Sequence, residues 1–144
     1  MRRQLLAIGF IFILVGCGGV STVPVSGKVI LDGKPLAGAT VTFTPAENKG
    51  APGPSSSGVT DASGQYSLAL TTDSNIKGAV VGKHKISISA IEGGTDAPAG
   101  ADPKPRVEKV PAEYNVNSTR TFDVPPGGTT SADFKIDSPP NAAK

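Results

Sequence analysis

The sequence predicts an all-β fold: a seven-stranded antiparallel Greek-key β-sandwich, preceded by a cleaved signal peptide. Short runs of alternating apolar and polar residues, separated by Gly, Pro, Asn and Asp, begin at Val25 and continue to Ile136. The 144 residues include 18 Gly and 13 Pro, which break long helices. Because each run has one apolar face, two sheets must pack together to bury those faces.

The N-terminal segment, residues 1–16, reads as a secretory signal peptide. Two arginines precede an apolar run from Leu5 to Val15, which is too short to span a bilayer. The stretch Leu14-Val15-Gly16-Cys17 resembles the bacterial lipobox, in which small residues admit the lipoprotein peptidase. The resemblance implies that the Cys17 thiol receives a diacylglycerol and that this residue becomes the lipidated, palmitate-bearing N-terminus.

Anchoring through lipid predicts the compartment and the charge of the mature protein. Residues 17–23 form a short tether, and position 18 is Gly rather than the Asp that favours inner-membrane retention in lipoproteins, so we expect the outer membrane. Removing Arg2 and Arg3 leaves 12 basic and 12 acidic residues, a net charge of zero that gives nucleic-acid binding no electrostatic support. The chain has no second cysteine for a disulfide.

The strands are predicted from alternation in one domain of residues 24–137. They are placed at residues 25–31, 39–45, 58–60, 65–70, 82–91, 119–124 and 131–136. The side chains expected to face inward are Val25, Gly27, Val29, Leu31, Val41, Phe43, Tyr66, Leu68, Leu70, His84, Ile86, Ile88, Ala90, Phe122, Val124, Ala132, Phe134 and Ile136.

The connections are predicted from turn chemistry. Asp32-Gly33 predicts a tight reversal, and Asp61-Ala62-Ser63-Gly64 predicts a hairpin between residues 58–60 and 65–70. Residues 46–57 read as an exposed loop, and the Pro- and Gly-rich residues 92–111 as a long functional or disordered connection. The tail, residues 138–144, is expected to be disordered.

Several turns and core positions carry a family resemblance. The runs Val25-Ser26-Gly27-Lys28-Val29, Asp32 to Val41 and Thr60 to Leu68 resemble the carboxypeptidase regulatory-like domain, and residues 78–84 and 110–115 are similar to small bacterial lipoproteins that carry this single domain. The resemblance implies a transthyretin-like (prealbumin-like) sandwich that is generally non-catalytic. It specifies a scaffold rather than a chemistry.

Individual polar residues favour structural roles. Related sandwich enzymes hold iron with two Tyr and two His, whereas His84 is the only histidine and lies on an inward face. Asp61 and Ser63 could offer oxygens to calcium, but a single carboxylate is a weak ligand set for this ion. Capping of the turn by Asp61 explains why these residue types occur here. We therefore expect no enzyme activity, no cofactor and no metal.

The predicted function is that of a non-enzymatic, lipid-anchored structural or protein-binding module of the cell envelope. The alternative is a carbohydrate- or small-ligand-binding accessory protein of the cell surface. Membrane contact through the lipid and an envelope protein or glycan are the expected partners.

Strand direction predicts where a partner binds. If successive strands alternate in direction, the connections after the first, third and fifth strands lie at the end of the domain opposite the tether. The long connection 92–118 lies there, and it carries the candidate partner-binding residues Asp96, Lys104, Arg106 and Tyr114.

Overall fold

A computed structural model describes residues 20–46, 53–93 and 105–138. Within these ranges the chain forms strands and one 3-10 helix, η1 (Ala112–Tyr114), and no α-helix, so the all-β prediction is confirmed. The strands are β1 (Thr22–Val23), β2 (Ser26–Leu31), β3 (Lys34–Pro35), β4 (Thr40–Pro45), β5 (Ser56–Val59), β6 (Gln65–Ser67), β7 (Ala69–Leu70), β8 (Ala79–Val80), β9 (Gly82–Ser89), β10 (Ile91–Glu92), β11 (Val107–Glu108), β12 (Thr121–Val124) and β13 (Phe134–Ile136).

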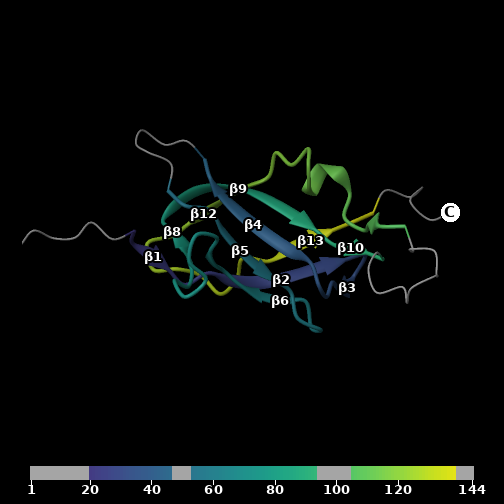
Figure 1. The fold of residues 1–144 in the computed structure, drawn as a ribbon, viewed down its shortest axis with the longest axis horizontal. Coiled ribbons are helices and arrows are strands. Elements are labelled where there is room, and N and C mark those ends of the chain that lie inside the picture. Colours follow the sequence, from purple (N-terminus) through teal and green to yellow (C-terminus); the bar gives the residue numbers. More distant parts are fainter. Residues whose placement is uncertain (1–19, 47–52, 94–104, 139–144) are drawn as a thin grey trace, which may run out of the picture.

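Two sheets form the sandwich (Figure 1). The larger has the order β12-β9-β4-β5-β7, and the other is built around β2, which pairs with β3, β6 and β13. The strands β4, β5 and β7 lie side by side in chain order, and β9 returns to pair with β4. A fourth strand that returns beside the first is the Greek-key connection, so this part of the prediction is also confirmed.

One pair departs from the antiparallel prediction. β13 pairs with β2 in parallel, with Phe134 opposite Val29 and Ile136 opposite Leu31. The reason lies in the alternation itself. The first and seventh major strands are separated by an even number of reversals, so they run in the same direction and must be parallel when they become neighbours.

The predicted faces are confirmed by the burial of the side chains. Val29, Val41, Phe43, Leu68, Ile86 and Ile136 are at most 1% exposed and belong to one core cluster. Phe122, Phe134 and Leu31 are partly buried and pack against that cluster. The Phe43 ring lies 5.7 Å from Phe122 and 6.1 Å from Phe134 in edge-on arrangements, which contribute stabilisation beyond area burial.

Two local predictions need correction. The exposed loop expected over residues 46–57 ends earlier, because β5 begins at Ser56, which is fully buried. The predicted hairpin is divided: β7 pairs with β5, whereas β6 pairs with β2 in the other sheet. At Leu68, between them, the backbone N–H donates to Val25 O and the carbonyl accepts from the N–H of Gly78, so the chain changes sheets at this residue.

The connections separate into two ends of the molecule. In Figure 1, β1 and β8 lie at one end, and β3 and β10 lie at the other. β1 pairs with β8, so the chain joins the fold at Thr22, two residues before the predicted domain boundary. At the C-terminal end, the Ser138 N–H donates to Asp32 Oδ1 at 2.7 Å. The predicted signal peptide and most of the predicted tail lie outside the described residues.

Candidate functional site

Only two of the predicted site residues lie in the described part of the chain. Cys17, Asp96 and Lys104 fall outside it. Arg106 is exposed and directly precedes β11, at the end of the molecule opposite β1. Tyr114 lies in η1, which follows β11 in the same connection.

Tyr114, the candidate tyrosine of the long connection, has its ring covered by the protein. Its side chain is only 7% exposed, and the Arg120 guanidinium lies over the ring at 4.1 Å from the centroid. Arg120 Nη2 also donates a hydrogen bond to the tyrosine hydroxyl at 2.7 Å. This cation–π contact and hydrogen bond hold the connection in place, so Tyr114 supports the region rather than forming a binding platform.

Glu108, which the sequence did not single out, organises this end of the molecule. Its Oε1 accepts from the backbone N–H groups of Ala90 at 2.7 Å and Val110 at 3.0 Å. Its Oε2 accepts from Ser89 Oγ at 2.5 Å and Asn115 Nδ2 at 2.8 Å. One carboxylate therefore joins the end of β9, the segment after β11 and the residue after η1.

The charge on Glu108 is stabilised by these contacts. Burial by itself raises the pKa of this carboxyl, but the hydrogen bonds from Ser89, Ala90, Val110 and Asn115 outweigh it and leave the pKa below its ordinary value. The carboxylate oxygens are fully used within the protein. Glu108 is therefore a structural residue, not an open acid or base.

Beside this carboxylate lies a hollow with mostly apolar walls, which we call the distal hollow. It has a volume of about 700 Å³ and is lined by Ser89, Ile91, Glu108, Val110, Pro111, Ala112, Asn115 and Val116. Ile91 and Val116 are 59% and 77% exposed, unlike the inward-facing aliphatic residues of the strands. Exposed aliphatic side chains around a hollow are typical of a contact surface for another molecule.

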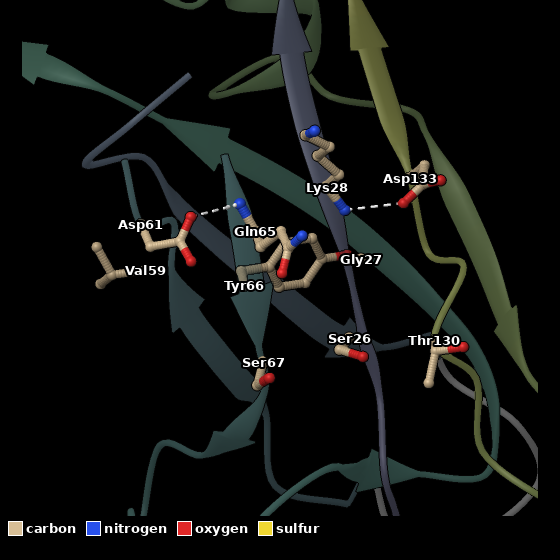
Figure 2. A pocket seen from close by; sticks show the side chains of 10 residues that line it. All are labelled: Ser26, Gly27, Lys28, Val59, Asp61, Gln65, Tyr66, Ser67, Thr130 and Asp133. Carbon is tan, nitrogen blue, oxygen red and sulfur yellow. Dashed lines mark hydrogen bonds between the residues drawn. The ribbon is translucent and has the colours of Figure 1, made fainter. Parts of the chain in front are cut away.

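A second depression, the polar groove, crosses the outer side of β2 and β6 (Figure 2). It has a volume of about 610 Å³ and is lined by Ser26, Gly27, Lys28, Val59, Asp61, Gln65, Tyr66, Ser67, Thr130 and Asp133. Asp133 Oδ1 accepts from the Lys28 backbone N–H at 2.8 Å, so the carboxylate replaces a strand carbonyl at this edge. The groove offers hydroxyl, amide and charged groups to a ligand.

Two residues that line the groove, Asp61 and Tyr66, use polar atoms in hydrogen bonds within the protein. Asp61 Oδ1 accepts from Ser63 N at 2.8 Å, Ser63 Oγ at 2.7 Å and Gln65 N at 3.0 Å, which confirms the capped turn. The Ser63 side-chain hydrogen bond, followed by that from Gln65 N–H, lowers the pKa of Asp61. Burial, with a smaller effect of Asp133, raises the pKa of Tyr66, whose hydroxyl donates to Ala132 O at 2.6 Å.

His84, which the sequence places on an inward face, lies in the core. His84 is 1% exposed, with Nδ1 2.9 Å from Gly82 O and Nε2 without a hydrogen-bond partner. Its ring packs near Phe43, at 5.8 Å between centroids. Among the described residues, no three His, Cys, Asp or Glu side chains come together as a metal site, and no helix is long and apolar enough to cross a membrane.

Comparisons with known proteins leave the family open. No family model matches the chain, and no curated protein matches it. Among solved structures, the chain is similar to a 9R-lipoxygenase from Cyanothece PCC8801, with 13% identity and a TM-score of 0.37. The match covers 98% of this chain but spans only 20% of the lipoxygenase. The resemblance to carboxypeptidase regulatory-like domains therefore stays a prediction from the sequence.

Proposed function

We propose that this protein is a non-enzymatic, lipid-anchored module of the cell envelope, held on the outer membrane through Cys17, that binds a protein partner with its distal hollow. The anchor is supported by the signal-peptide pattern of residues 1–16 and the lipobox-like stretch before Cys17. The scaffold is supported by the turn and core residues that resemble carboxypeptidase regulatory-like domains.

One observation carries the binding role: Ile91 and Val116 stand exposed at the distal hollow, at the end of the molecule away from β1. The Glu108 carboxylate, which lines the hollow, already accepts hydrogen bonds from four donors within the protein. The part of the lining that is left to contact a partner is therefore mainly apolar. A protein partner that inserts an aliphatic side chain fits this chemistry, and a tether at the opposite end leaves the hollow accessible.

Site-specific photo-crosslinking in native envelopes tests this role. A photoreactive residue at Val116 should yield one discrete crosslinked protein, whereas the same residue at Lys135, which is exposed on β13, should not. Val116→Asp, combined with a photoreactive residue at Ile91, should abolish the adduct while leaving the melting temperature unchanged. Absence of an adduct at both Ile91 and Val116 would contradict the proposal.

The second candidate function is binding of a glycan or small polar ligand, and the polar groove is the observation that favours it. Its hydroxyl and amide groups suit a polyhydroxylated ligand, although the one aromatic residue there, Tyr66, is 3% exposed and offers no stacking platform. Saturable glycan binding that is lost in Gln65→Ala and kept in Val116→Asp would favour this function over the first.

A further inference from the structure

A second set of exposed aliphatic side chains surrounds the point where the chain enters the fold. Val20, Ile76 and Val81 are 49%, 39% and 43% exposed. Val20 lies just before β1, Ile76 lies before β8, and Val81 directly follows β8. β1 and β8 lie at the end of the molecule opposite β10, the strand that contributes Ile91 to the distal hollow (Figure 1). The core covers these residues only in part.

Pairing of β1 with β8 brings these residues together. Thr22 lies opposite Val80 and Val23 opposite Ala79, so the antiparallel register places Val81 beside the chain that leads to Val20. Thr22 Oγ1 also donates to Lys77 O at 3.0 Å, which brings the segment containing Ile76 to the same strand. The three aliphatic residues therefore share one end of the sandwich.

The chain length before this surface limits what can cover it. Cys17 precedes Val20 by three residues, which span at most about 10 Å when extended. A lipid on Cys17 therefore holds this end of the molecule within reach of the bilayer that receives it. No equivalent constraint applies to Val116 at the other end.

The charges at this end make aliphatic contact the main source of attraction. Lys77 and Lys83 are exposed, and so are Asp73 and Asp123, the latter opposite Lys83 across the β9–β12 pair. Among these four described residues the two signs balance, so anionic headgroups gain little from them. We therefore expect this end to contact neutral and anionic bilayers equally well.

We propose that Val20, Ile76 and Val81 form a membrane-contact surface that rests on the lipid bilayer, at the boundary between headgroups and acyl chains. The inference rests on the proposed lipid anchor at Cys17 and adds to it a defined orientation. The sandwich stands with its β1–β8 end on the membrane and its distal hollow away from it. Shallow burial of aliphatic side chains supplements the acyl chains.

Tryptophan scanning tests this surface cleanly because the chain contains no Trp. The full lipidated protein, carrying I76W or V81W, is reconstituted into phosphatidylcholine vesicles with and without brominated acyl chains. We expect a blue-shifted emission and about twofold stronger bromine quenching than for the matched control V116W, since side chains at the boundary lie within reach of the brominated positions. The result should be unchanged with phosphatidylglycerol present.

Flotation of the same vesicles separates the two proposals. If the protein floats but I76W and V81W are quenched no more than V116W, the contact surface is refuted and the anchor stands. If the protein does not float, the anchor fails and the orientation fails with it. A blue shift that depends on protein concentration and not on brominated lipid would assign the surface to a second copy of the chain and overturn the proposal.

Discussion

At the scale of single residues, Gly27 determines how closely the last segment of the chain approaches β2. A Cβ atom at Gly27 would lie 2.0 Å from the Ala132 carbonyl oxygen, and backbone atoms cannot move away as a flexible side chain can. The approach is fixed by hydrogen bonds from Ala132 N–H to Ser26 O and from the Tyr66 hydroxyl to Ala132 O. Glycine is required here for space.

We expect Gly27→Ala to destabilise the protein by about 3 kcal/mol, because the clash with Ala132 forces β2 away from the segment that precedes β13. Gly127→Ala is the matched control, since a Cβ atom at that position would meet nothing within 4 Å, and its effect should stay within about 0.5 kcal/mol. Urea unfolding followed by circular dichroism measures both. Equal midpoints would show that the two segments are not in contact.

Glu108 makes the stability of the folded protein depend on pH. Its pKa is lowered in the folded protein, so its contribution to stability is complete above the pKa of an unfolded glutamate, about 4.3, and is lost as the pH falls through the folded value. Glu108→Gln should cost about 1–2 kcal/mol at pH 7 because four donors lose a charged acceptor. It should also remove part of the acid sensitivity of unfolding.

The comparison of wild type with variant isolates this carboxyl. The pKa values of Asp32 and Asp61 are lowered as well, by hydrogen bonds from Ser138 and Ser63, and both remain in the variant. Glu113→Gln, at an exposed position in η1, serves as the control. Unfolding curves for Glu108→Gln that run parallel to wild type from pH 7 to pH 3 would contradict the assigned role.

At the scale of elements, the pairing of β10 with β11 joins the two arms of the long connection. Ile91 pairs with Glu108 and Glu92 with Val107, and Lys109 Nζ lies 2.7 Å from Glu92 Oε2. The exposed ion pair contributes little, so the strand pairing and the Glu108 hydrogen bonds hold the two arms together. The intervening residues 95–104 can therefore be changed without opening this end.

Deleting residues 95–104 should leave the protein folded, because loop length changes the closure free energy by only about 0.6 kcal/mol per doubling. It removes Asp96 and Lys104 and should weaken crosslinking to a partner at Val116 if those residues contribute to binding. Deleting residues 47–52, between β4 and β5, is the matched control and should leave crosslinking intact. Equal crosslinking yields in the two deletions would show that Asp96 and Lys104 do not contribute to partner binding.

At the scale of the whole molecule, the two ends of the sandwich carry different surfaces. The β1–β8 end holds the entry of the chain, and the opposite end holds the distal hollow and Arg106. Alternation of strand direction produces this separation, because connections after odd-numbered major strands all emerge on the same side. This separation is what the proposed anchor and the proposed partner site require, since a tether at the β1–β8 end would leave the opposite end open.

Cys17→Ser should yield an unlipidated precursor of higher mass that is lost from the membrane fraction after detergent-free washing. The serine hydroxyl cannot replace the thiol that accepts the lipid, and a single uncleaved signal segment is too short for a stable anchor. Ser21→Ala, which keeps the thiol, is the control. Wild-type mass and membrane recovery in Cys17→Ser would contradict the lipoprotein proposal.

The sequence by itself determined the faces of the strands and the chemistry of the turns, because both depend on neighbours along the chain. Val41, Phe43, Ile86 and Ile88 alternate with polar residues, and all four are buried. Asp32-Gly33 makes its reversal with positive φ at both residues, and Asp61 caps its turn. Period-two patterning and local hydrogen bonds need no knowledge of distant segments.

Only the tertiary structure decided which distant groups meet. Alternation treats Ser89 and Lys85 as equivalent outward positions, yet Ser89 Oγ donates to Glu108, so an aspartate at position 89 would face a carboxylate while one at position 85 would not. Glu108 lies within the long connection, which shows no periodicity, and Tyr114 is buried beneath Arg120. Ser89 and Glu108 are 19 residues apart in the sequence, and they meet because β10 pairs with β11 across the long connection, which no local pattern in either segment predicts.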